Sequence, residues 1–217
     1  MPYRAQPISV ETYTLGELDT NCYLVWEEPS FEAILIDPGD AGDFLADQIR
    51  ERKLHLSAIL LTHGHFDHAL GLLALRVTFP DVPICLHAED EGLLARAQAS
   101  AEHWLKHPVD PVPSATMSIS ESSQFHIGSQ LLSVIETPGH TPGSCSFHIS
   151  TPKQELLFTG DTLFKAGVGR TDFSYSKPLD LELSVQSLFD TFSSDTICFC
   201  GHGEVTTIGA EITGAQD

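Results

Sequence analysis

Four side chains that can bind metal ions lie within six residues of the sequence: His63, His65, Asp67 and His68. The apolar residues 58–61 before them predict a strand that ends in a ligand-bearing loop. His63 and His65 are two residues apart and can bind one ion, whereas Asp67 and His68 can bind a second. A solvated polar loop is the alternative, because histidine is common at surfaces and short motifs give false positives. A metal pair therefore needs further ligands from elsewhere in the chain.

Three later segments supply such candidates, each at the end of a predicted strand. His140 lies on a turn between two Pro-Gly pairs. Asp161 and His202 each follow an apolar segment and a glycine. In every case a strand ends, a glycine frees the backbone and a ligand follows, which is typical of a site built from loops at one edge of a sheet sandwich.

The elements that must position these residues form one predicted domain over residues 1–217, because this length suffices for one large domain. Apolar periodicity predicts strands over residues 8–13, 22–26, 33–36, 58–61, 82–86, 124–126, 131–135, 145–149, 155–159 and 197–200, and helices over 44–52, 69–79, 89–99 and 179–189. Strands and helices mix in two similar halves. The fold class expected is therefore α/β, as a four-layer αβ/βα sandwich.

The composition limits the classes of partner. The chain has 30 acidic and 11 basic residues, and its formal net charge of -19 repels nucleic-acid phosphates and anionic membranes. We therefore expect a small-molecule substrate, with no nucleic acid or membrane as partner; the oligomeric state is left open. Residues 1–6 lack a charged and apolar leader, and five cysteines without regular spacing form no disulfide framework. These features predict a cytoplasmic protein.

The ordered set of motifs resembles the metallo-β-lactamase superfamily over nearly the whole chain. The set is His63-x-His65-x-Asp67-His68, followed by His140, Asp161 and His202. Residues 160–164 (Gly-Asp-Thr-Leu-Phe) and 167–172 (Gly-Val-Gly-Arg-Thr-Asp) further resemble the glyoxalase II branch, in particular its short members without the C-terminal helical domain. The resemblance implies the metallo-β-lactamase fold. Because the chain ends soon after Glu204, we expect weaker binding of glutathione than in members that have that domain.

The resemblance also implies two divalent metal ions, with zinc as the first expectation and iron or manganese as alternatives. The implied ligands are His63, His65 and His140 for the first ion and Asp67, His68 and His202 for the second, with Asp161 bridging both. Two ions ~3.5 to 4 Å apart would share a water whose pKa falls toward ~7. Asp67 is the catalytic residue expected to orient the resulting hydroxide toward a polarised carbonyl. Because a thiolate leaves easily, the expected substrate is a small thioester of the S-lactoylglutathione type.

Three further features have two interpretations each. Asp37 either accepts a hydrogen bond from the outer ring nitrogen of a ligand histidine or caps a turn or helix. Arg170 lies where, by resemblance, glyoxalase II proteins carry a basic residue that contacts glutathione. It either binds a substrate carboxylate or forms an ion pair with Asp172 or Asp180. The Pro-rich residues 103–116 either cover the site or only connect two elements.

Two other functions stay open on the sequence. A persulfide dioxygenase shares the fold, the ligand motifs and a run like residues 169–173, but by resemblance it binds one iron ion, here through His63, His140 and Asp161. A non-catalytic binding protein on the same scaffold normally lacks some ligands, whereas all seven are present here. Metal analysis combined with oxygen consumption would separate the hydrolase from the dioxygenase.

Overall fold

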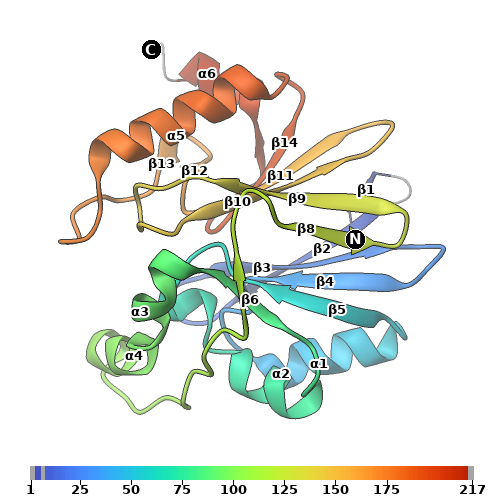
Figure 1. The fold of residues 1–217 in the computed structure, drawn as a ribbon, viewed down its shortest axis with the longest axis vertical. Helices are drawn as coiled ribbons and strands as arrows, with labels where there is room; N and C mark the ends of the chain where they lie inside the picture. Colours follow the sequence, from blue (N-terminus) through green and yellow to red (C-terminus); the bar gives the residue numbers. More distant parts are fainter. Residues whose placement is uncertain (1–2, 6–7, 215–217) are drawn as a thin grey trace.

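Two mixed sheets pack face to face, with helices on both outer sides, in the computed structural model of residues 3–5 and 8–214 (Figure 1). Within these residues, one sheet has seven strands in the spatial order β1-β2-β3-β4-β5-β6-β7, and the other has six in the order β15-β14-β11-β10-β9-β8. This layering confirms the predicted αβ/βα sandwich. Residues 1, 2 and 6 of the stretch inspected for a leader lie outside the described residues.

The first sheet pairs its strands antiparallel up to β4 and parallel from β4 to β7. Its strands are β1 (Tyr3–Ala5), β2 (Ile8–Leu15), β3 (Thr20–Glu27), β4 (Glu32–Ile36), β5 (His55–Leu60), β6 (Ile84–His87) and β7 (Met117–Ile119). In the second sheet, β11 and β14 pair in parallel, and the other pairs are antiparallel. Its strands are β8 (Gln124–Ile127), β9 (Gln130–Glu136), β10 (Cys145–Ser150), β11 (Glu155–Gly160), β14 (Ile197–Cys200) and β15 (Thr206–Thr207). A separate hairpin joins β12 (Leu163–Phe164) to β13 (Gly167–Val168).

The helices cover the outer faces of the two sheets. They are α1 (Gly42–Glu51), α2 (Leu72–Thr78), α3 (Glu91–Leu94), α4 (Ala97–Leu105), α5 (Pro178–Thr191) and α6 (Ile208–Gly214), with short 3-10 turns η1 (Phe66–His68) and η2 (Ala88–Asp90). Figure 1 shows α1 to α4 on the side of the first sheet and α5 and α6 on the side of the second. None of the helices in this part of the chain is long and apolar enough to cross a membrane.

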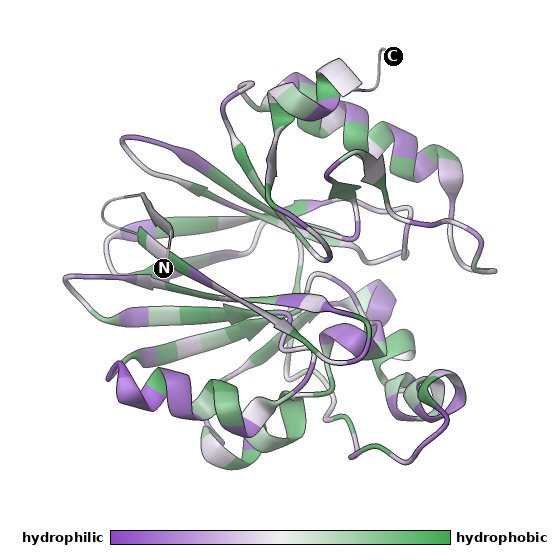
Figure 2. Cartoon of the chain, turned by 180° about the vertical axis from the view of Figure 1, so that it is seen from behind, coloured by the Kyte–Doolittle hydropathy of each residue, from purple (hydrophilic) through white to green (hydrophobic). Residues whose placement is uncertain are grey.

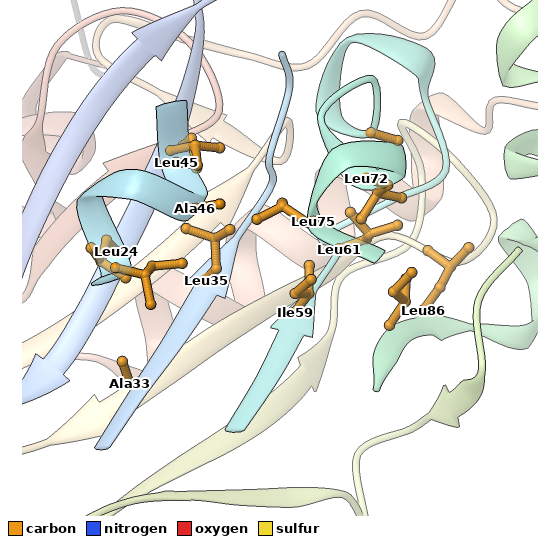
Figure 3. Close-up of a cluster of buried hydrophobic side chains, with 14 of the residues drawn as sticks. Leu24, Ala33, Leu35, Leu45, Ala46, Ile59, Leu61, Leu72, Leu75 and Leu86 are labelled. Atoms are coloured by element: carbon orange, nitrogen blue, oxygen red, sulfur yellow. The ribbon is translucent and has the colours of Figure 1, made fainter. Parts of the chain in front are cut away.

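Buried side chains fill the space between the sheets and the space beneath each helical layer. All residues of β3 are buried, because the strand is covered on both faces. Val25 packs between the sheets, whereas its neighbour Leu24 packs in the layer of α1 and α2, in the same buried cluster as Leu35 and Leu45 (Figure 3). Figure 2 shows hydrophobic residues concentrated in the strands and many hydrophilic residues along α1 and α5.

Several predicted boundaries were wrong; the helix predicted over residues 89–99, for example, is divided into η2, α3 and the start of α4. Two further differences bear on the site. The helix predicted over residues 69–79 begins at Leu72, because residues 66–68 form the separate turn η1 that carries two candidate ligands. Helix α4 continues to Leu105, so the first part of the Pro-rich segment 103–116 is helical rather than a loop. The helix ends where Lys106 adopts a left-handed backbone with φ of 65°.

Candidate metal centre

The candidate ligands come from loops at one edge of the two sheets. In the first sheet, Asp37 follows β4 and His63 follows the parallel neighbour β5. In the second sheet, Asp161 follows β11 and His202 follows its parallel neighbour β14. Because the carboxyl ends of parallel strands lie at the same edge of a sheet, each pair delivers two side chains to one place. His140 joins them from the connection between β9 and β10.

Two glycines allow the loops of the second sheet to close around the site. A Cβ at Gly201 would lie 2.2 Å from Oδ1 of Asp161. Gly160 has a φ of 48°, and a Cβ there would lie 2.5 Å from Oγ1 of Thr62. Any larger residue at either position would therefore push a site residue away.

Asn21, on β3, anchors the loop of His202 to the opposite sheet. Its backbone N–H donates to the carbonyl of Gly201 at 2.8 Å. Its buried side-chain amide donates to the carbonyls of Cys200 at 3.1 Å and Gly203 at 2.9 Å. These bonds fix the position of the loop, although the loop belongs to the other sheet.

Asp90, which the sequence patterns did not mark, joins two ligand loops. Its buried carboxylate accepts hydrogen bonds from the backbone N–H groups of Gly64 at 2.8 Å and Gly143 at 2.7 Å, and from the hydroxyl of Thr141 at 2.7 Å. Gly64 belongs to the histidine-rich loop, and the other two donors belong to the loop of His140. Burial raises the pKa of Asp90, against the effect of its donors. Its partners are distant in sequence, so no local motif signals this role.

Three histidines direct their ring nitrogens at one position. Nδ1 of His65 lies 3.0 Å from Nε2 of His63 and 3.0 Å from Nε2 of His140. One ring nitrogen carries either one proton or one lone pair, so hydrogen bonding satisfies at most one of these contacts. A metal ion accepts all three lone pairs, and tetrahedral coordination places such nitrogens roughly 3.3 Å apart. The cluster therefore fits a metal ion.

A second cluster consists of Asp67, His68 and His202. Oδ2 of Asp67 lies 3.3 Å from Nε2 of His202 and 3.6 Å from Nε2 of His68. Within the described residues, the buried Nε2 of His68 has no hydrogen-bond partner. An unsatisfied buried polar atom costs about 1–3 kcal/mol, a cost that a bound cation would remove.

Asp161 lies between the two clusters. Its Oδ2 is 3.5 Å from Nε2 of His140, whereas its Oδ1 is 3.4 Å from Nε2 of His68 and 3.7 Å from Nε2 of His202. Oδ1 is also buried, without a hydrogen-bond partner in the part of the chain that the structure describes. One oxygen directed at each cluster is an arrangement in which a carboxylate can bridge two ions.

Backbone carbonyls hold two of the ligand histidines from outside the site. Nδ1 of His140 donates to the carbonyl of Arg170 at 2.8 Å, and Nδ1 of His202 donates to the carbonyl of Leu18 at 3.0 Å. A proton on the outer nitrogen leaves a lone pair on the inner one. This is the tautomer that a metal ligand needs.

The buried carboxylate of Asp37 orients two more rings. Its Oδ2 lies 2.9 Å from Nδ1 of His68 and accepts the hydroxyl of Thr62 at 2.7 Å, while Oδ1 accepts the backbone N–H of Thr62 at 2.7 Å. The hydroxyl oxygen of Thr62 in turn lies 3.0 Å from Nδ1 of His63. Of the two interpretations of Asp37, these contacts favour support of a ligand histidine.

Tyr175 is a second residue that sequence reasoning missed. Its hydroxyl lies 2.7 Å from Nε2 of His65, and its ring stacks on Phe173 with 5.3 Å between the ring centroids. Burial raises the pKa of Tyr175 to about 12, so the hydroxyl keeps its proton at neutral pH. It can accept the outer N–H of His65, as the carbonyls do for the other rings.

Electrostatics in the site favour a bound cation. Burial and the neighbouring imidazoles lower the pKa of His63 well below its ordinary value, and burial with an adjacent imidazole lowers the pKa of His65 to about 4. Burial alone would raise the pKa of Asp67 and of Asp161, but the nearby His68 lowers both pKa values below their ordinary range. The first cluster thus offers neutral imidazoles and the carboxylates are ionised, which are the donors that divalent transition metals prefer. In the second cluster burial would lower the pKa of His68 and of His202, but the carboxylates raise both pKa values, so binding of a metal ion there would release protons.

A cavity of about 540 Å³ opens at the two clusters. Among its lining residues are the candidate ligands His65, Asp67, His140, Asp161 and His202 and the apolar side chains Leu18, Phe66, Trp104, Leu105, Phe164, Val168 and Phe173. Of the Pro-rich residues 103–116, Trp104 and Leu105 line this cavity, and both belong to helix α4. The segment 103–116 therefore contributes to the wall of this cavity through the end of helix α4.

Arg170 also lines the cavity, but its guanidinium is engaged. Nε and Nη2 donate to the two carboxylate oxygens of Asp172 at 2.6 Å each, and the guanidinium lies 4.6 Å from the ring centroid of Phe173. Of the two interpretations of Arg170, the structure contains the ion pair. A substrate carboxylate can use Nε and Nη2 of Arg170 only after these atoms have left Asp172.

We expect Tyr175→Phe to weaken binding of the first metal ion by about 10- to 100-fold, because the group that orients His65 is lost while the stacked ring is kept. Competition with a chelator measures the affinity, and thermal unfolding of metal-free protein checks the fold. Tyr13→Phe is the matched control, because the Tyr13 hydroxyl contacts Gln48 on α1 at 3.4 Å, away from the ligands. Equal metal affinity of the two variants would contradict the role of Tyr175.

Comparisons with known proteins agree with this geometry. A family model described as the metallo-beta-lactamase superfamily matches residues 15–202, a range that includes all seven candidate ligands. The hydroxyacylglutathione hydrolase GloC of Haemophilus influenzae is 30% identical over 204 residues, which cover 94% of this chain and 95% of that protein.

Two solved structures share the fold over most of their length. TTHA1623 in a di-iron-bound form superimposes with a TM-score of 0.83 at 34% identity, covering 94% of this chain and 97% of that chain. The B3 metallo-beta-lactamase BLEG-1 has a TM-score of 0.83 at 32% identity, covering 94% and 96%. The family match covers both sheets except β1, most of β2 and β15, and it includes every loop that carries a candidate ligand. This chain therefore belongs to the metallo-β-lactamase superfamily.

Proposed function

We propose that this protein is a binuclear metal-dependent hydrolase that cleaves a small thioester of the hydroxyacylglutathione type. The observation that carries the proposal is the position of Asp161 between two ligand clusters, with one oxygen directed at each. Similarity to GloC supports the substrate class, and similarity to a di-iron-bound protein supports the presence of two ions.

The proposed ligands of the first ion are His63, His65 and His140, and those of the second are Asp67, His68 and His202. Asp161 is proposed to be shared, because its two oxygens face His140 and His68. When bound, two metal ions would supply a water with a pKa lowered to about 7 and would polarise the substrate carbonyl. Asp67 is the proposed catalytic residue that orients the attacking water. The hydroxyl of Thr20 donates to its Oδ2 at 3.2 Å, which restrains the carboxylate.

The walls of the cavity suit a thioester. Apolar side chains such as Trp104 and Phe173 line the cavity and would shield the reacting carbonyl of a bound substrate from part of the bulk water. A thiol has an ordinary pKa of about 8.5, so a thiolate is a good leaving group and does not need protonation by a strong acid. The chain's own residues thus need only hold the ligands, orient the water and position the carbonyl.

The test combines metal content with activity. Metal-replete protein should contain close to two transition-metal ions per chain and release thiol from S-lactoylglutathione, because two complete ligand sets are present. Elemental analysis and a thiol-reactive dye measure the two quantities, and protein stripped by a chelator and then reloaded is the control. At most one ion per chain after metal-replete expression would count against the binuclear site.

The same experiment decides the alternative function. A mono-iron persulfide dioxygenase would consume oxygen with glutathione persulfide and would release no thiol from any small thioester. That combination of results, with one iron ion per chain, would replace the hydrolase with the dioxygenase.

A further inference from the structure

A second cavity, of about 360 Å³, adjoins the metal cavity along helix α4. The residues that line both cavities are His65, Phe66, Ser100 and Tyr175. Arg96, which immediately precedes α4, lines only the second cavity, and Trp104 lines only the metal cavity. Positions 96, 100 and 104 are four residues apart, so their side chains follow one face of the helix. We call this wall, formed by Arg96, Ser100, Trp104 and Tyr175, the α4 groove.

Arg96 is the cation of the α4 groove, and it is available to a ligand. Its side chain is exposed, and among the described residues it has no ion-pair partner. The other arginine near the site, Arg170, is bound to Asp172 through two hydrogen bonds of 2.6 Å. In a chain with 30 acidic and 11 basic residues, an unpaired guanidinium in a cavity that the candidate ligand His65 also lines provides a local site for an anion.

We propose that the α4 groove binds the thiol half of the substrate and that Arg96 pairs with a carboxylate on it. This inference rests on the proposed function and narrows its substrate class to thioesters whose thiol half carries a carboxylate. Four residues of helix rise by roughly 6 Å, so the groove extends roughly 12 Å from Trp104 to Arg96. An extended tripeptide spans roughly 10 Å, which matches that reach. The planar guanidinium can hold a carboxylate with two parallel hydrogen bonds.

The first arm of the test compares two substrates and three variants. The substrates are S-lactoylglutathione and the lactoyl thioester of N-acetylcysteamine, whose thiol half has no carboxylate. In metal-replete protein, Arg96→Ala should raise KM for S-lactoylglutathione about 10-fold, keep kcat within about 2-fold and leave KM for the neutral thioester unchanged. Lys153→Ala removes an equal charge from the exposed β10–β11 turn and should change neither KM. Arg170→Ala tests the other arginine.

The second arm measures binding without catalysis. Calorimetric titration with S-methylglutathione should give about 10-fold weaker binding by Arg96→Ala than by the wild type or Lys153→Ala. If no thioester is hydrolysed, the proposed function fails, while this arm still decides the inference. No binding by the wild type, equal affinity of wild type and Arg96→Ala, or a larger effect of Arg170→Ala than of Arg96→Ala would overturn it.

Discussion

Asp161→Ala is expected to lose both metal ions and to lower kcat/KM by about 10³-fold or more. The carboxylate has one oxygen near His140 and the other near His68 and His202, so its removal opens both clusters at once. Two bound ions supply several kcal/mol of transition-state stabilisation, and about 4 kcal/mol corresponds to this loss of rate. Elemental analysis after equilibrium dialysis measures the metal content directly.

His202→Ala is the comparison for that experiment. His202 belongs to only one cluster, so we expect this variant to lose chiefly one ion. Circular dichroism shows whether both variants keep the fold. Equal metal content in Asp161→Ala and His202→Ala would overturn the assignment of Asp161 as the bridge between the clusters.

Asp37→Ala is expected to lower the stability of the metal-free protein by about 3–5 kcal/mol and to weaken binding of the second ion by about 10- to 100-fold. Burial disfavours a charge on His68, but Asp37, followed by other carboxylates, raises its pKa well above the ordinary value. The two therefore form a buried ion pair in metal-free protein, with side chains 0% and 1% exposed. Alanine would leave His68 and Thr62 without their shared partner.

The pH at which stability should be measured follows from the raised pKa of His68. Because the pKa of His68 is higher in the folded than in the unfolded protein, its pairing with Asp37 stabilises the fold fully below about pH 6.5. This contribution is lost as the pH rises through the folded-state pKa. Urea unfolding at pH 6 should therefore show the full effect. The control is Asp47→Ala, whose exposed side chain lies 4.0 Å from Arg50 and should change stability by less than about 0.5 kcal/mol. Similar unfolding midpoints for the two variants would disprove the role of Asp37.

The sequence alone determined which side chains gather and which elements deliver them. Gly160 at the end of β11 and Gly201 after β14 each directly precede a ligand, and after β5 Gly64 lies between the ligands His63 and His65; this order is local. A strand that is buried on both faces, such as β3, has a continuous apolar run that can be recognised from the sequence alone. The seven candidate ligands therefore came together as the motifs predicted.

Only the tertiary structure decided what supports the ligands and what lines the cavity. Asp90 bonds Gly64 and Gly143, and Tyr175 meets His65, across 26 to 110 residues of sequence. Arg170 forms the ion pair with Asp172, one of two interpretations that the sequence left open. Such contacts form where separate loops meet in space, so no periodic pattern along the chain records them. A single carboxylate or hydroxyl looks the same in sequence whether it faces solvent or a ligand ring, and burial alone distinguishes the two.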